Sequence, residues 1–129
     1  MNRKSVKARF VPYDVIAGIL ALVKGKYLAS SRRKIHQAIC ELRKSHQLLK
    51  CFPFDQDSFS CVLGESLDLL ELSRLMTGES PDFRRLVLDP KHQKRIYQKL
   101  PQHFNDAQIK ELQQIAQEFE ERCKSSFER

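Results

Sequence analysis

The chain has 129 residues, of which 41% are hydrophobic, with 23 Lys and Arg against 16 Asp and Glu and no Trp. This length and composition suit one globular domain that needs neither a metal nor disulfides, and they exclude the disordered and collagen-like classes. The longest apolar stretch runs from Val15 to Val23. It is far shorter than the roughly twenty residues that cross a bilayer, so no membrane span is predicted.

Charge is distributed unevenly along the chain. Residues 1–50 contain twelve Lys and Arg and two acids, residues 51–89 contain three Arg and eight acids, and residues 90–129 contain eight basic and six acidic residues. A basic front half attracts phosphate polyanions, and it equally attracts the acidic middle of a second copy. The four cysteines are too sparse for a disulfide scaffold, so we expect reduced thiols and a cytoplasmic location.

The N-terminal part predicts a flexible basic arm followed by two helices. Residues 1–10 are basic and show little apolar periodicity. The first helix is expected to begin near Pro12 and to end at Gly25, with an apolar stripe for the core. Ser30 or Ser31 can cap a second helix, whose other face is strongly basic. Its apolar residues recur at helical spacing: Ile35, Ile39, Leu42 and Leu49.

The acidic middle predicts a connection, a helix and a strand. Cys51–Ser60 contains three Phe residues and is expected to be a connection anchored to the core by aromatic rings. A third helix follows from about Leu63 to Leu75. Thr77–Asp82 is a dense turn signal, and Arg84–Leu88 is the best strand candidate.

Two helices are predicted after Asp89. The first covers Lys91–Leu100 and is expected to stop at Pro101. Asn105 is expected to cap the second, long helix, with Gln108 completing a capping box. A narrow apolar stripe along this last helix either packs on its own domain or forms a dimer seam. The stripe consists of Ile109, Leu112, Ala116, Phe119 and Cys123.

The order of these elements, with the stretches Leu67–Met76 and Phe83–Leu88, resembles the winged helix-turn-helix superfamily over about residues 12–89. The resemblance implies a mainly α fold with a small β hairpin, followed by a short helix and a long C-terminal helix. It also implies that the third helix enters a DNA major groove and that Ser80–Asp82 forms the tip of the wing.

We expect three segments: a flexible arm over residues 1–10, a winged-helix-like domain over 11–100 and the C-terminal helix over 101–129.

The exposed face of the third helix is acidic, which argues against reading of DNA by this helix. Glu65, Asp68 and Glu71 lie on adjacent turns. Groove walls are lined with phosphates and repel such a face unless other cations outweigh it. An acidic helix and a basic front instead suit a protein interaction module that docks onto another chain, which is the alternative prediction.

The first turn of the second helix carries three cations at the pole of the helix that disfavours them. A capped helix start with unpaired N–H groups and nearby cations forms a phosphate or carboxylate pocket, so we predict an anion site there. The alternative is a solvated basic face. The candidate nucleic-acid or anion-binding residues are Arg32, Arg33, Lys34, Lys24, Lys26, Arg43, Lys44, Arg84 and Arg85.

No catalytic or metal-binding motif is present in the sequence. His36 and Cys40 stand at i and i+4, but two further zinc ligands at motif spacing are missing, and His36 is expected in solvent. The four glycines are scattered, so no phosphate-binding loop can be built. We therefore predict a small regulatory or adaptor module without catalysis, cofactor, metal or small-molecule substrate. It binds nucleic acid or another polyanion and forms a homodimer.

Overall fold

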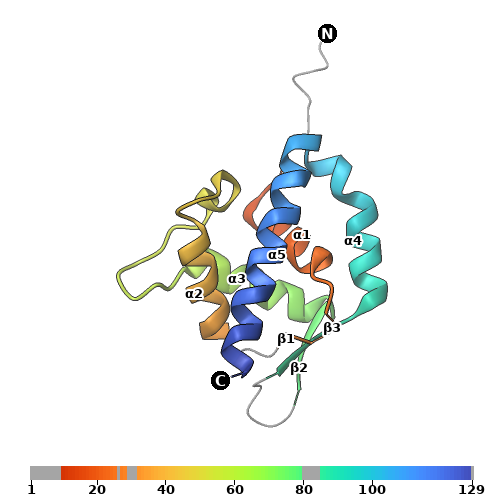
Figure 1. The fold of residues 1–129 in the computed structure, drawn as a ribbon. Helices are drawn as coiled ribbons and strands as arrows, with labels where there is room; N and C mark the ends of the chain where they lie inside the picture. Colours follow the sequence, from red (N-terminus) through yellow and green to blue (C-terminus); the bar gives the residue numbers. More distant parts are fainter. Residues whose placement is uncertain (1–9, 26, 29–31, 80–84, 129) are drawn as a thin grey trace.

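The structure is a computed structural model that describes residues 10–25, 27–28, 32–79 and 85–128. Within these ranges the chain is mainly helical, and a small sheet lies at one end of the helices (Figure 1). The helices are α1 (Pro12–Leu22), α2 (Arg32–Leu42), the 3-10 helix η2 (Gln47–Cys51), α3 (Cys61–Leu72), α4 (Pro90–His103) and α5 (Asp106–Glu128). The strands are β1 (Tyr27–Leu28), β2 (Met76–Glu79) and β3 (Arg85–Leu88).

The three described strands form one antiparallel sheet with β3 in the centre, in the order β1-β3-β2. Tyr27 of β1 pairs with Val87, and Met76 of β2 pairs with Leu88. The sheet therefore joins the segment after α1 to the segment before α4.

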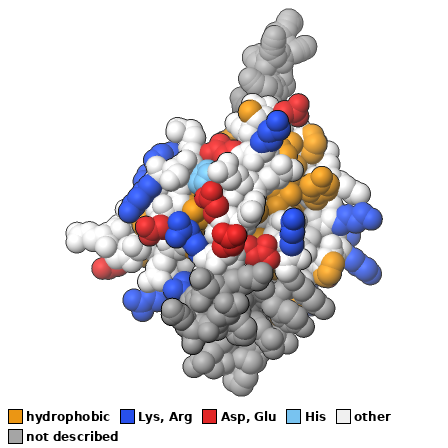
Figure 2. All heavy atoms as spheres, in the orientation of Figure 1, with side chains coloured by type: hydrophobic (Ala, Val, Ile, Leu, Met, Phe, Trp, Pro, Cys, Tyr) orange, Lys and Arg blue, Asp and Glu red, His pale blue; other side chains and the backbone are white. Residues whose placement is uncertain are grey.

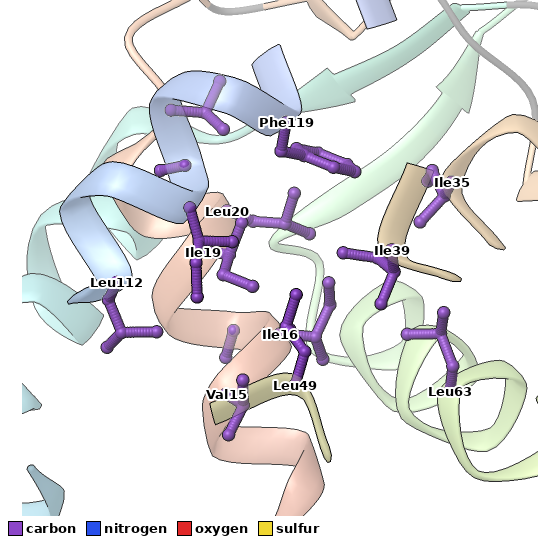
Figure 3. Packing of buried hydrophobic residues seen from close by; sticks show 14 of the residues in the cluster. Val15, Ile16, Ile19, Leu20, Ile35, Ile39, Leu49, Leu63, Leu112 and Phe119 are labelled. Atoms are coloured by element: carbon purple, nitrogen blue, oxygen red, sulfur yellow. The ribbon is translucent and has the colours of Figure 1, made fainter. Parts of the chain in front are cut away.

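Helix α1 is the centre of the core. Every residue from Val15 to Leu20 is buried, because α3, α4 and α5 all contact this helix. A helix covered on several sides needs apolar residues all round, which accounts for the continuous apolar stretch in the sequence. Figure 3 shows Ile16 and Leu20 converging with Ile39 of α2 and Phe119 of α5.

Gly18 allows the helices around α1 to approach closely. A Cβ atom at this position would lie 3.2 Å from Cδ1 of Leu112 on α5 and 3.3 Å from Cδ2 of Leu100 on α4. These distances are tight, so the absence of a side chain sets the spacing of the three helices.

Side-chain caps fix the beginnings of α3 and α5. The Ser60 hydroxyl accepts a hydrogen bond from the Leu63 N–H at 3.2 Å, so α3 begins at Cys61, two residues before the prediction. At α5, Asn105 N–H donates to Gln108 Oε1 at 2.9 Å, and Gln108 N–H donates to Asn105 Oδ1 at 2.8 Å. The predicted capping box is confirmed.

A residue in the left-handed region ends α3. Arg74 has φ 71°, its N–H donates to the Glu71 carbonyl, and the Leu75 N–H donates to the Leu70 carbonyl, both at 3.1 Å. This is a Schellman motif, which satisfies the last carbonyls of the helix. The motif explains why α3 ends at Leu72 and not at Leu75.

The predicted ends of α1, α2 and α4 are wrong as well. Helix α1 ends at Leu22, three residues before Gly25. Helix α4 passes through Pro101 and ends at His103, because a proline in the last turn removes only the hydrogen bond to the Tyr97 carbonyl. Helix α2 ends at Leu42, so Leu49 is buried from η2 and is not part of the α2 stripe.

The predicted strand over Arg84–Leu88 is present as β3 from Arg85 onward. Strand β2 lies at residues 76–79, which were predicted as helix end and turn, and no bounds were predicted for the first strand of the hairpin that the resemblance implies. The two-residue strand β1 was not expected. Three predictions lie outside the described residues, namely most of the arm over 1–10, the cap at Ser30 or Ser31, and the wing tip Ser80–Asp82.

Candidate functional site

The first cation of the predicted anion site is paired within the chain. Arg32 Nη1 lies 2.8 Å from Asp68 Oδ1, and its Nη2 lies 3.3 Å from Glu71 Oε1 on α3. These carboxylates offset the positive pole of α2 and half-cover Arg32, whose side chain is 34% exposed. Carboxylates of the chain itself therefore account for Arg32 at this pole, without an external anion.

The remaining cations around α2 differ in exposure and in pairing. Arg33 is exposed and makes no ion pair within the described residues, whereas Lys34 is half-buried and has a partner. Arg43 and Lys44 follow the far end of the helix, about 15 Å away along its axis. Lys44 Nζ is 3.8 Å from Glu41 Oε2, and the Nε atom of Arg43 is buried without a hydrogen-bond partner.

The other predicted cations are placed only in part. Lys24 is exposed just after α1. Lys26 and Arg84 lie outside the described residues, and the backbone of Arg85 belongs to β3 while its side chain is not described. Among the described members, the structure does not unite the predicted cluster into one surface.

Helix α4 carries a basic face that the sequence analysis missed. We define the α4 basic face as Lys91, Lys94, Arg95 and Lys99. All four side chains are exposed, and none makes an ion pair or hydrogen bond with the described part of the chain. Figure 2 shows Lys and Arg side chains along the right-hand edge, where α4 lies, and acidic side chains gathered over α5. The signal was present in the sequence, because residues 90–103 contain four cations and no acid.

The inner side of α4 holds this face rigidly on the core. Leu100 is buried and Ile96 is half-buried against it. The Gln93 side-chain amide donates to the carbonyls of Leu20 at 2.8 Å and Val23 at 3.2 Å, at the C-terminal end of α1. Helix α4 is thus tied to α1 by apolar packing and by hydrogen bonds.

A side-chain hydrogen bond spans the first turn of α4. The Asp89 carboxylate contacts His92 Nδ1, and this hydrogen bond lowers the pKa of Asp89. A negative charge at the start of a helix interacts favourably with its dipole. The pair leaves the α4 basic face unneutralised, because neither residue contacts a member of that face.

A cavity of about 610 Å³ lies between α2, α3 and the loop that precedes α3. Its lining combines aromatic, basic, acidic and hydroxyl groups. The residues are Arg32, Arg33, His36, Gln37, Asp57, Ser58, Phe59, Cys61, Gly64, Glu65 and Asp68.

His36 forms the inner wall of this cavity. It is only 5% exposed, which corrects the expectation that it lies in solvent. Its Nδ1 accepts a hydrogen bond from the Ser60 N–H at 3.2 Å, and its ring stacks on Phe59 with centroids 4.6 Å apart. Burial, and then the charge of Arg32, lower the pKa of His36. The ring is therefore neutral near pH 7, with its proton on Nε2.

A tight loop holds Phe59 over His36. The Asp55 carboxylate accepts hydrogen bonds from the N–H groups of Asp57 at 2.8 Å and Phe59 at 3.1 Å. Ser58 has φ 60°, which turns the chain back toward α3. The loop presents a phenyl ring that is still 45% exposed.

The apolar stripe of α5 is used inside the chain. Leu112, Ala116, Phe119 and Cys123 are buried, Ile109 is half-buried, and α5 packs on α1 and α2. The stripe therefore packs on its own domain, which is the first of the two predicted alternatives.

Polar contacts lock α5 to the segment after α2. His46 is buried, and its Nε2 lies 2.9 Å from Glu118 Oε1. The Leu48 N–H donates to Glu111 Oε2 at 3.2 Å. The hydrogen bond from His46 lowers the pKa of Glu118.

The outer face of α3 carries exposed leucines as well as acidic side chains. Leu72 is 78% exposed and Leu69 is 51% exposed. They lie among Glu65, Asp68 and Glu71, which are exposed as the sequence predicted. A nucleic acid would be repelled by this face, whereas a protein partner can cover its leucines.

The described ranges contain neither a metal-binding cluster nor a membrane-spanning helix. No group of three His, Cys, Asp or Glu side chains there could hold a metal ion. The four cysteines form no disulfide with one another, and burial raises the pKa of Cys51 to about 11. No helix among the described residues combines the length and the apolar character that a membrane crossing requires.

In comparisons with known proteins, no family model, no curated protein and no solved structure matches this chain. The function is therefore inferred from the surfaces and the cavity described above.

Proposed function

We propose that this chain is a regulatory or adaptor module without catalytic activity that binds nucleic acid or another polyanion through the α4 basic face. The observation that carries the proposal is that all four cations of this face are exposed and unpaired within the described residues. Unpaired cations in water bind polyanions by releasing the counterions of the phosphates. The site thus lies on α4 and not at the start of α2.

The arrangement of the elements supports a winged-helix architecture for this module. A helix, a short strand, two helices and two antiparallel strands follow one another, and the last strand is central in the sheet. The connection from α2 to α3 runs over residues 43–60, which is much longer than the turn of a helix-turn-helix motif. This long connection and the acids of α3 argue against contacts between α3 and the bases of DNA. They support contacts between α4 and the phosphate backbone of the nucleic acid.

The spacing of the cations along α4 allows contacts with several phosphates of a duplex at once. Lys91 and Lys99 are about 12 Å apart along the helix axis. A duplex carries one negative charge per about 1.7 Å of its axis, so the α4 basic face meets several phosphates without any sequence preference.

The test compares two triple variants that remove the same charge. Lys91→Gln, Lys94→Gln and Lys99→Gln remove cations from α4, whereas the control carries Lys44→Gln, Lys50→Gln and Lys110→Gln, which are also exposed. Fluorescence anisotropy with a random-sequence duplex should show at least a tenfold loss of affinity for the α4 variant and less than threefold for the control. Equal losses would mean that only net charge matters, and no loss would refute the proposal.

A second candidate function is docking of a partner protein on α3, and the exposed Leu69 and Leu72 favour it. Leu69→Gln with Leu72→Gln should then abolish self-association or partner capture without lowering the free energy of unfolding. Light scattering at high concentration and pull-down experiments measure the two outcomes. An unchanged result in both measurements would leave α3 as an ordinary solvated face.

A further inference from the structure

The cavity between α2 and α3 contains a buried hydrogen-bond donor that the fold does not use. Because Nδ1 of His36 accepts from Ser60, the proton of the neutral ring lies on Nε2. Nε2 has no partner among the described residues, although His36 is only 5% exposed. Within the described residues, Arg43 Nε is the only side-chain nitrogen or oxygen that is fully buried without a hydrogen-bond partner. The unpartnered His36 Nε2 is therefore in contact with solvent. This donor therefore opens onto the cavity.

Phe59 supplies a flat apolar surface at the same place. One face of its ring stacks on His36 at an interplanar angle of 17°. The residue nevertheless remains 45% exposed, and the loop fixed by Asp55 holds it there. An exposed aromatic ring on a rigid loop is a stacking surface for another flat ring.

The charges of the lining are of both signs. Arg33 is exposed and free of ion pairs within the described residues, whereas Arg32 is held by Asp68 and Glu71. Glu65 is an exposed carboxylate on the α3 side of the cavity. A complementary ligand has a flat ring, an acceptor for the His36 donor, an anionic group for Arg33 and hydroxyl or amino groups for the acids.

A nucleoside monophosphate has all of these features, and we propose that this cavity binds one. Its base stacks on the face of Phe59 that His36 leaves exposed, and a ribose or phosphate oxygen accepts a hydrogen bond from His36 Nε2–H. Its phosphate lies against Arg33, since a guanidinium suits phosphate oxygens. Glu65 and Asp57 accept hydrogen bonds from ribose hydroxyls or an exocyclic amine. The cavity volume of about 610 Å³ is within the range of small-ligand sites.

Calorimetric titration of the full chain tests the proposal with separate ligands. The ligands are the 5′-monophosphates of adenosine, guanosine, cytidine and uridine, together with the four nucleosides and inorganic phosphate. At least one nucleotide should bind, and both its nucleoside and phosphate alone should bind at least tenfold more weakly. Binding of phosphate alone with the same affinity would show an anion site without base recognition. That result, like the absence of nucleotide binding at millimolar concentration, would overturn the proposal.

Variants locate the binding in the cavity. Phe59→Leu should weaken nucleotide binding about five- to hundredfold, the range measured for loss of base stacking. Arg33→Gln should reduce the affinity for the nucleotide to that for its nucleoside. Both residues are surface-exposed, so circular dichroism should show unchanged folding. Unchanged nucleotide affinity in Phe59→Leu would refute the site.

The α4 triple variant separates this proposal from the duplex-binding function. It should bind nucleotide with unchanged affinity, because no α4 residue lines the cavity. Loss of nucleotide binding in that variant would place the nucleotide on α4 and contradict the assignment.

Discussion

Arg32 is tolerated at the positively polarised N-terminus of α2 because two carboxylates of α3 contact it. Two carboxylate oxygens of Asp68 and Glu71 lie within 3.3 Å of the guanidinium. All three side chains are at least one-third exposed, so solvent screens the interaction and its contribution stays below about 1 kcal/mol. Its main effect is to remove one cation from the exposed surface of α2. His36, one turn later, is buried instead and presents a single donor to the cavity.

Arg74 stores backbone strain at the end of α3. Its φ of 71° lies in the region where a Cβ atom costs roughly 1–2 kcal/mol. Arg74→Gly should raise the free energy of unfolding by up to about 1 kcal/mol, because glycine adopts this conformation readily. Urea unfolding measures the change. The control is Ser73→Gly, where φ is −81° and no gain is expected. A gain in the control and none at Arg74 would contradict the assignment of the motif.

The lowered pKa of His36 makes stability depend on pH. The unfolded state takes up a proton on this ring near the ordinary histidine pKa of about 6.5, while the folded state does so only at lower pH. The free energy of unfolding should therefore fall as the pH decreases from 7.5 to 5.5. His36→Gln keeps an acceptor for the Ser60 N–H and should show a smaller fall over the same interval in urea unfolding. An equal fall in both proteins would mean that His36 titrates normally.

Helices α4 and α5 differ in which of their side chains are buried. Helix α5 packs its apolar stripe against α1 and α2, and the contact between His46 and Glu118 at 2.9 Å fixes it further. Helix α4 buries Leu100, half-buries Ile96 and leaves its cations in water. A helix that packs through one narrow side presents its opposite side as a stable surface.

Phe119 tests whether the α5 stripe belongs to the core. Its side chain is fully buried. Phe119→Ala should lower the free energy of unfolding by about 3–5 kcal/mol, since it leaves a cavity between α5, α1 and α2. The exposed Gln117→Ala on the same helix should change stability by less than about 0.5 kcal/mol. A Phe119→Ala variant that stays as stable as the wild type but changes its oligomeric state would restore the seam interpretation.

Local signals predicted the helices better than the sheet. The α5 cap followed from Asn105 and Gln108, which are three residues apart. Strand β1 could not be predicted, because its two residues are extended only through pairing with β3. The same limit applies to the site. The pairing of Arg32 depends on contacts between α2 and α3, which the sequence does not specify. The α4 basic face is visible in the sequence of residues 90–103, but the acids of α5 nearly balance its charge when residues 90–129 are taken together.

At the scale of the whole molecule, the α4 basic face and the acidic outer face of α3 lie on different helices. The α4 basic face has no partner in the described chain, and the outer face of α3 combines acids with exposed leucines. This separation favours a module with two surfaces, one for a polyanion and one for a protein. The cavity between α2 and α3 adds a third location, which is separate from the α4 basic face and adjoins the outer face of α3 through Glu65 and Asp68.

The salt dependence of duplex binding tests the claim for α4 most directly. The slope of log affinity against log salt counts the phosphates that the protein neutralises, at about 0.9 per contact. Replacing Lys91, Lys94 and Lys99 by Gln should reduce the magnitude of this slope by about two to three relative to the wild type. The matched variant at Lys44, Lys50 and Lys110 should keep the wild-type slope. A slope that is unchanged in the α4 variant, or reduced equally in both, would contradict the assignment of the polyanion site to α4.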